Sequence, residues 1–452
     1  MRRFDAAIIG AGVTGIATAR RLALAGQHVV LLEKGADILS GASKANSALL
    51  HTGFDAPEGS LELRCMQRGH AEFMAIRSAM NLPVLQTGAM VVAWTDAQHA
   101  ALSEILAAAQ RNGVTDTQLI SKEELLAREP QLSDQARAAV LVPQEFVIDP
   151  WSPFHGYAQE ILSTGGTIQR RTEVTGGRFD GAHWQIDTPG GPFHATSVIN
   201  CAGLYGDRID ALVLGQTHFT IKPRKGQFVV FDKAAARLLH TIILPAPDAR
   251  TKGVVLTPTI FGNLLVGPTA EETDDRHRAT TTGPELQMLL AKAVEILPAL
   301  RDMPVTATYA GLRPATEFKD YRIHHDASCN WLTVGGIRST GLTASLGIAH
   351  HVADLLGIAP GPATTPPWMP NLAEYGPRDW QTPGYGAIVC HCEMVTQREI
   401  EAALASPFPP GDLGGLKRRT RCAMGRCQGF NCLGRIEELT RGRLSPAIAI
   451  AP

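Results

Sequence analysis

The sequence lacks features that would each define a class of protein. No window approaches the roughly 18 uncharged apolar residues that a membrane-spanning helix needs, so any membrane contact is expected to be peripheral, for instance through a partner. Neither sign of charge dominates, because 42 Lys and Arg residues stand against 43 Asp and Glu residues and the formal net charge is -1. A nucleic-acid binder or a polybasic membrane anchor is therefore not expected.

Cysteine is scarce through most of the chain. Three of the eight cysteines, Cys65, Cys201 and Cys329, are scattered singly, and the other five follow residue 389. This distribution argues against a disulfide framework and favours a local metal or cluster site. The remaining composition, 44% hydrophobic and 19% charged over 452 residues, is that of a globular protein with two or three packed domains.

The first residues, MRRFDAAIIGAGVTGIA, share two arginines and an apolar run with signal peptides. Asp5 precedes that run, three glycines interrupt it, and it continues as an amphipathic helix pattern without a cleavage site. We therefore expect mature structure here and a cytoplasmic protein.

A nucleotide-binding fingerprint follows at once. Residues 5–33 read DAAIIGAGVTGIATARRLALAGQHVVLLE, an apolar strand, Gly10-x-Gly12-x-x-Gly15, a helix pattern and a second strand that ends on Glu33. In such a βαβ unit Gly10 makes the turn, Gly12 admits the pyrophosphate, and Gly15 lets helix and strand pack closely. The helix N-terminus would bind the phosphates, and Glu33 would accept hydrogen bonds from the adenosine ribose, which disfavours NADP.

That unit does not distinguish FAD from NAD, but two later segments favour a flavin. SVINCAGLYGDRI (197–209) is a buried strand running into Ala202-Gly203, a second place where the backbone can approach a dinucleotide. Residues 330–356 follow the same pattern, with a strand, the turn Gly335-Gly336, a loop with Gly341 and then a helix. The dipole of that helix, near Thr343, would favour the negative charge of a reduced flavin.

Together with the fingerprint, the segments GASKANSALLHTGF, VINCAGLYGD, PRKGQFVVFDK, YAGLRPAT and GGIRSTGLTASLG resemble the FAD-dependent oxidoreductases of the D-amino-acid oxidase superfamily. They are most similar to L-2-hydroxyglutarate dehydrogenases and the catalytic subunit of anaerobic glycerol-3-phosphate dehydrogenase, over about residues 3–358. The resemblance implies an α/β fold, a Rossmann-like FAD-binding domain with an inserted mixed α+β substrate domain, followed here by a small C-terminal helical iron–sulfur domain.

The expected domain order follows from the resemblance and from strand-rich stretches at 84–94, 222–231 and 254–266. A helical stretch over 96–125 is expected to cover the inserted sheet. Prolines crowd the segment after residue 357, which predicts an extended tether. The predicted parts are FAD-binding 1–80, substrate 81–150, FAD-binding 151–220, substrate 221–310, FAD-binding 311–358, a Pro-rich linker 359–385 and a [2Fe-2S]-binding domain 386–445.

The late cysteines form a C-x-C pair and a C-x4-C pair with one extra thiol. They are Cys390, Cys392, Cys422, Cys427 and Cys432. Such thiolates can converge on one centre, and soft sulfur selects zinc or iron–sulfur. His391 keeps zinc open, although zinc ribbons favour C-x2-C spacing. Spacing alone leaves zinc, a cluster or an empty site as alternatives.

The segments IVCHCEMVT and GLKRRTRCAMGRCQGFNC resemble the [2Fe-2S] domain of bacterioferritin-associated ferredoxin, a module also found in anaerobic glycerol-3-phosphate dehydrogenases. The resemblance implies a [2Fe-2S] cluster held by Cys390, Cys392, Cys427 and Cys432. Cys422 departs from the family pattern, which has a small apolar residue there, and it could compete as a ligand.

A basic run precedes the second cysteine pair, at Lys417, Arg418, Arg419, Arg421 and Arg426. It is either a solvated face or a set of charges that offsets the thiolates and raises the cluster potential.

Two residues are candidates for catalysis. In family members the arginine of YAGLRPAT, here Arg313, faces the flavin and binds the substrate carboxylate or phosphate, for which a guanidinium is suited; a structural salt bridge is the alternative. His51 could take the hydroxyl proton as hydride leaves for flavin N5, or it could simply pack. The resemblance also assigns Ser43, Asn46, Ser47, Val174 and Leu342 to FAD contacts.

A flavin collects two electrons at once, whereas a [2Fe-2S] cluster passes them singly, so the tail is interpreted as an electron exit and the protein as a dehydrogenase. The expected substrate is a small anionic 2-hydroxy acid or polyol phosphate, and the expected acceptor is a partner subunit, a quinone-linked protein or a ferredoxin-like carrier. Oxidation of an amino acid, imino acid or opine is one alternative, and a redox-sensing or electron-transfer subunit without its own substrate is another.

Overall fold

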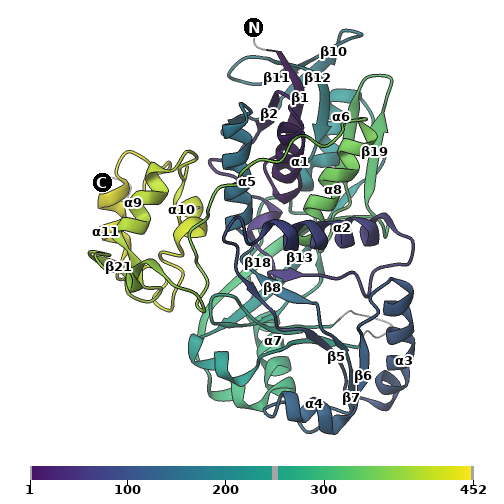
Figure 1. Ribbon diagram of the computed structural model, residues 1–452, viewed down its shortest axis with the longest axis vertical. Coiled ribbons are helices and arrows are strands. Elements are labelled where there is room, and N and C mark those ends of the chain that lie inside the picture. Colours follow the sequence, from purple (N-terminus) through teal and green to yellow (C-terminus); the bar gives the residue numbers. More distant parts are fainter. Residues whose placement is uncertain (1–2, 247–252, 449–452) are drawn as a thin grey trace.

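Three bodies make up the computed structural model, which describes residues 3–246 and 253–448 (Figure 1). A sheet flanked by helices contains the N-terminus, a second sheet with its own helices lies below it in this view, and a small helical domain near the C-terminus sits to one side. Among the described residues, no helix is both long and apolar enough to cross a bilayer.

The first body is built on a sheet assembled from distant parts of the chain. Its strands run in the order β10-β11-β12-β1-β2-β9, with β20 beside β12 and β19 beside β20. The β20-β12-β1-β2-β9 pairings are parallel, as in a doubly wound nucleotide-binding fold. The strands are β1 (Arg3–Ile9), β2 (Val29–Leu32), β9 (Thr167–Gln169), β10 (Gly176–Phe179), β11 (Trp184–Asp187), β12 (Phe193–Asn200), β19 (Arg322–Asp326) and β20 (Trp331–Gly335).

Apolar helices cover this sheet because the strands are buried on both faces. Val29–Leu32 is entirely buried, and α8 is buried along most of its length. In Figure 1, α1 and α8 lie against the sheet while α5 lies beside α1. The helices of this body are α1 (Val13–Leu24), α2 (Leu61–Ile76), α5 (Ser152–Ser163), α6 (Gly206–Leu214) and α8 (Gly341–Leu355).

The second body is a mixed sheet in the order β17-β13-β16-β15-β14-β5-β7-β6, with β18 paired to β13. Its strands are β5 (Ala89–Ala93), β6 (Gln118–Ile120), β7 (Ala138–Val142), β13 (Ile221–Phe231), β14 (Ile242–Pro245), β15 (Val255–Pro258), β16 (Leu264–Gly267), β17 (Glu271–Glu272) and β18 (Val305–Thr316). Its helices are α3 (Asp96–Arg111), α4 (Lys122–Arg128) and α7 (Gly283–Ile296). A separate three-stranded sheet has β8 (Phe146–Ile148) in the middle, with β3 (Leu49–Leu50) and β4 (Val84–Leu85) on either side.

Two sequence expectations change here. The predicted boundary at 310 falls inside β18, which pairs with β13 along its whole length, so Arg313 lies on the second sheet. The helix expected over 96–125 ends at Arg111, because Gly113 has a φ of +81° and the chain then enters β6. Apolar spacing continued across that break, which is why periodicity missed it.

The Pro-rich tether packs over the first two bodies in an extended form. The Met369 N–H donates to the Met80 carbonyl at 3.0 Å, and the Glu374 N–H donates to the Ile260 carbonyl at 3.0 Å. Met369 and Leu372 are buried. The tether therefore holds the third body in place as well as reaching it.

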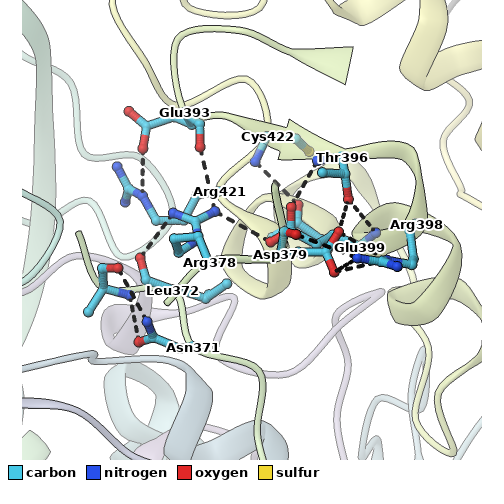
Figure 2. A network of polar contacts seen from close by, with 12 residues as sticks. Asn371, Leu372, Arg378, Asp379, Glu393, Thr396, Arg398, Glu399, Arg421 and Cys422 are labelled. Carbon is cyan, nitrogen blue, oxygen red and sulfur yellow. Dashed lines mark hydrogen bonds and ion pairs between the residues drawn. The ribbon is translucent and has the colours of Figure 1, made fainter. Parts of the chain in front are cut away.

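The third body contains α9 (Gln397–Ala405), α10 (Leu413–Thr420), α11 (Leu433–Thr440) and the short hairpin β21 (Ile388–Cys390) and β22 (Val395–Thr396). Figure 2 shows how the tether is tied into it: Arg378 reaches the Leu372 carbonyl and the Glu393 carbonyl, and it pairs with Glu399. Arg421 donates to Glu393 at 3.0 Å in the same network.

The basic run is largely a docking surface. Arg418, Arg419 and Arg421 are buried, which excludes a solvated face for these three. Arg419 pairs with Asp37 and Arg426 with Asp232, both in the other two bodies. Arg419, Arg421 and Arg426 therefore have carboxylate partners, and Arg426 also lies close enough to Cys392 to interact with its thiol.

Candidate active site and cysteine centre

A cavity of about 1920 Å³ opens between the first two bodies. It is lined by the glycine turn after β1, the loop of residues 40–47, the end of β12, the start of α8 and the inner side of β13 and β18. Nearly all the predicted cofactor residues meet there: Gly10, Gly12, Glu33, Ser43, Asn46, Ser47, Val174, Ala202, Gly203, Gly336, Gly341 and Leu342.

The glycine turn is shaped to admit a phosphate group. Helix α1 begins after Gly12 without a side-chain cap, and its first residues face the cavity. The Val13 N–H donates to Ser43 Oγ at 3.0 Å, so the loop of residues 40–47 closes over this end of the helix. An uncapped helix N-terminus at a cavity is an anion-binding arrangement, which fits a dinucleotide pyrophosphate.

Gly15 is not in the cavity wall. A Cβ atom there would lie 1.9 Å from the Gly10 carbonyl oxygen, so its role is to let α1 approach the turn. This close packing agrees with the role predicted from the sequence. Gly15 does not line the cavity, so it is not placed to contact a cofactor there.

The Glu33 carboxylate is hydrogen-bonded to both of the turns that would surround an adenosine. Its carboxylate accepts from the Ala11 N–H at 2.8 Å and the Gly35 N–H at 2.6 Å, while the side chain lines the cavity. Asn46 uses its amide within its own loop, donating to the Ser43 carbonyl and accepting from the Ala48 N–H. It therefore shapes the wall.

Helix α8 points its start at the cavity, also without a side-chain cap. Gly341 and Leu342 line the wall, as expected. Thr343 lies behind it: its hydroxyl accepts from the His51 N–H at 2.9 Å and donates to the Leu49 carbonyl at 3.2 Å. Thr343 thus fixes the backbone that carries His51.

Arg313 lies on β18 opposite Arg224 and lines the cavity. Its guanidinium reaches only the Thr269 carbonyl, at 3.4 Å from each terminal nitrogen. No ion pair to Arg313 is present among residues 3–246 and 253–448, so the salt-bridge alternative finds no partner there. Burial, followed by the neighbouring Arg224, lowers the pKa of Arg313 to about 10. The site has a cation that an anionic ligand would stabilise.

His51 faces the same cavity and is held by a carboxylate that sequence reasoning missed. Its Nδ1 lies 2.9 Å from Oε2 of Glu145, whose side chain is fully buried. The sequence does contain a hint, because Glu145 is an acid enclosed between the apolar runs of β7 and β8.

Three polar side chains near this part of the fold are held by neighbouring side chains. Arg224 pairs with Glu272 and Lys225 with Glu271. The Tyr321 hydroxyl contacts Thr340 Oγ1 at 2.6 Å.

The four predicted ligand cysteines come together in the third body as two pairs. Cys392 hydrogen-bonds Cys427, and Cys390 hydrogen-bonds Cys432. A Cβ atom on Gly425 would lie 2.3 Å from Cys392 Cβ, so only glycine lets the two ligand loops approach this closely. Cys432 stands at the start of α11, and burial, followed by the neighbouring Cys390, raises the pKa of its thiol to about 12.

The four cysteines match a [2Fe-2S] cluster in ligand type and number, since such a cluster takes four thiolates, two for each iron. In the described part of the chain, no group of three or more His, Cys, Asp or Glu side chains is preformed as a metal site. His391 is exposed on the turn between Cys390 and Cys392. Cys422 is fully buried in the core of this body, near Cys390 and Cys432.

Comparison with known proteins supports both the flavin-binding part of the chain and the C-terminal cysteine domain. The model of the FAD dependent oxidoreductase family (DAO) matches residues 5–355, and that of the BFD-like [2Fe-2S] binding domain matches residues 388–441. A glycerol 3-phosphate dehydrogenase of Caloramator mitchellensis is 32% identical over 453 aligned positions, covering 96% of this chain and 93% of that protein. An L-2-hydroxyglutarate dehydrogenase of Indibacter alkaliphilus is 29% identical over 272 positions, covering 59% and 68%.

Among solved structures, the dithionite-reduced L-α-glycerophosphate oxidase of Mycoplasma pneumoniae with FAD bound superposes with a TM-score of 0.74 at 27% identity. The match covers 82% of this chain and 97% of that one.

Proposed function

The chain belongs to the family of FAD-dependent oxidoreductases and carries a BFD-like [2Fe-2S]-binding domain, and from that premise we propose that it is a dehydrogenase of glycerol 3-phosphate. The observation that carries this proposal is a cavity shared by the imidazole of His51 and the guanidinium of Arg313, which has no ion pair within residues 3–246 and 253–448.

Each of these residues has a part in the reaction. Arg313 binds the anionic group of the substrate through paired hydrogen bonds. His51 accepts the proton of the hydroxyl group that is being oxidised. When bound, FAD supplies the acceptor for the hydride, and the [2Fe-2S] cluster carries single electrons onward. The uncapped starts of α1 and α8, with Glu33, are the parts of the chain that would hold FAD.

The comparisons support a dehydrogenase over an oxidase. A relative that matches 96% of the chain, tail included, is called a dehydrogenase. The match to the oxidase structure covers 97% of that protein but only 82% of this chain, so part of this chain has no counterpart there. An additional electron-transfer domain is what a dehydrogenase needs and an oxygen-reducing enzyme does not. The protein acceptor and a cytoplasmic location remain predictions of this proposal.

Anaerobic titration of the purified holoprotein tests the substrate. We expect glycerol 3-phosphate to bleach the flavin absorbance, and glycerol, which has the same hydroxyls without the anion, to leave it unchanged. Bleaching by L-2-hydroxyglutarate or glycine instead would reassign the substrate class. Failure of all of these anions, with dithionite still reducing the flavin, would overturn the proposal in favour of an electron-transfer subunit.

A further inference from the structure

A buried carboxylate stands directly behind the base of the proposed reaction. Glu145 lies between β7 and β8, and its side chain is 0% exposed. Oε2 faces Nδ1 of His51 at 2.9 Å, and Oε1 accepts from Thr52 twice, from the N–H at 2.6 Å and from the hydroxyl at 2.8 Å. The two oxygens of this carboxylate therefore have different partners.

We infer that Glu145 is a positioning residue that sets the tautomer and direction of the His51 ring and stabilises its protonated form. The inference rests on the proposed function, since it assigns His51 as the proton acceptor. A carboxylate can only accept a hydrogen bond, so Nδ1 of His51 must carry a proton. In the neutral imidazole the lone pair is then on Nε2, the nitrogen on the other side of the ring from Glu145.

Both the ring and the backbone of His51 are held. The His51 N–H donates to Thr343 on α8, and the next residue, Thr52, is fastened to Glu145 by two hydrogen bonds. This leaves the imidazole with little freedom to turn away from the cavity that it lines. A base held in one orientation is what proton transfer at a fixed substrate position requires.

The charges around Glu145 favour His51 as the group that becomes cationic. Among the described residues, His70 on α2 is a further titratable group near Glu145, and burial lowers its pKa while its Nε2 lies 3.2 Å from the Gln144 carbonyl. Among the described residues, the ion-pair partner of Glu145 is His51. An opposite charge at this distance favours the protonated imidazole.

The step balances as an alcohol oxidation. The hydroxyl hydrogen leaves as a proton to Nε2 of His51, and the hydrogen on the same carbon leaves with its electron pair to FAD, the acceptor of the proposed reaction. A carbon–oxygen double bond forms, and the imidazolium is paired with the Glu145 carboxylate until its proton passes to solvent.

The substitution Glu145→Gln tests this role sharply. The introduced amide can keep both Thr52 contacts through its oxygen, which turns its NH₂ group toward Nδ1 of His51. That nitrogen must then accept, the proton moves to Nε2, and the ring can no longer take the substrate proton. We expect flavin reduction in anaerobic stopped flow to slow by at least about 100-fold, with FAD content unchanged.

Glu129→Gln is the matched control. Glu129 is a glutamate with 1% exposure that accepts from the His240 and Thr241 N–H groups and faces the His240 ring, outside the cavity. It should alter stability without slowing flavin reduction. In a His51→Ala background, Glu145→Gln should add no further loss; an equal loss in both backgrounds would show a structural role and overturn the inference.

Failure of this inference and failure of the proposed function give different results. If the wild-type flavin is reduced by an anionic substrate and Glu145→Gln is reduced equally fast, only the positioning role is wrong. If no substrate reduces the wild type, ¹⁵N-histidine NMR still decides: the His51 resonances, identified by their loss in His51→Ala, should show Nδ1–H in the wild type and Nε2–H in Glu145→Gln. A wild-type Nε2–H tautomer would contradict the inference.

Discussion

Arg419 in the third body donates two hydrogen bonds to the carboxylate of Asp37 in the first, at 2.6 Å and 3.1 Å. Asp37 is fully buried and also accepts from the Gly411 N–H at 3.1 Å. The guanidinium of Arg418 donates to the Ile38 carbonyl at 3.0 Å. The proposed cluster domain is therefore fixed against the loop that follows the nucleotide-binding strand β2.

We expect Arg419→Met to loosen this contact, because it leaves Asp37 as a buried carboxylate without its nearest cation. Breaking a buried pair on one side typically costs about 3 kcal/mol or more. Limited proteolysis should then cut the tether between residues 359 and 385 faster than in the wild type. Arg426→Met is the control, since the Arg426 side chain is largely exposed and solvent weakens its pair with Asp232. Equal cleavage of both variants would show that the Arg419 pair does not hold the domain.

Cys422→Ala should keep its iron, whereas Cys427→Ala should lose most of it. Cys427 contacts Cys392 in one thiol pair, whereas Cys422 is fully buried in the apolar core of this body, near Cys390 and Cys432. The resemblance to the ferredoxin family assigns the ligand role to Cys427. Iron content per chain and the visible absorbance of anaerobically purified protein measure the difference. Loss of iron from Cys422→Ala with iron retained in Cys427→Ala would make Cys422 the ligand.

Arg313→Met should raise the substrate concentration needed for half-maximal flavin reduction by more than about 100-fold. The reason is that an anion in the cavity would lose its buried charge partner, a change of about 3 kcal/mol. Dithionite should reduce the variant normally. Arg224→Met is the control, because Arg224 already pairs with Glu272. Similar effects of the two substitutions would place the anion elsewhere.

Replacing either of two fingerprint glycines by alanine should have different effects: Gly15→Ala should lower stability, and Gly12→Ala should weaken FAD binding. Gly15→Ala places Cβ 1.9 Å from the Gly10 backbone oxygen, so the fold itself should lose about 2–3 kcal/mol of stability. A Cβ atom on Gly12 would meet Ser43 Oγ at 3.0 Å, a side-chain atom that can move, and would then intrude on the pyrophosphate position. We expect Gly12→Ala to fold but to retain less FAD. Thermal unfolding of the apoproteins, with FAD titration, separates the two effects, and equal melting temperatures would contradict this assignment.

Much of the candidate site was predictable because its chemistry is local in the sequence. The fingerprint glycines and Glu33 lie within one βαβ unit, whose geometry dictates which backbone groups meet a phosphate. The cysteine pairs are likewise short-range patterns of a soft ligand. Domain edges were less accessible, as β18 shows, because a strand belongs to whichever sheet its hydrogen bonds join.

By itself, the sequence determined the nucleotide-binding fold, because the glycine fingerprint has fixed residue types at fixed spacing. Its resemblance to known families supplied the candidate FAD contacts and the four candidate ligand cysteines. Only the tertiary structure decided what stands beside His51, whether Arg313 has a counter-ion and where the basic run lies. Glu145 is 94 residues from His51, and Asp37 is 382 residues from Arg419. Contacts over such separations depend on how the sheets and helices pack, and the same arginines have the same sequence pattern whether they are solvated or buried in an interface.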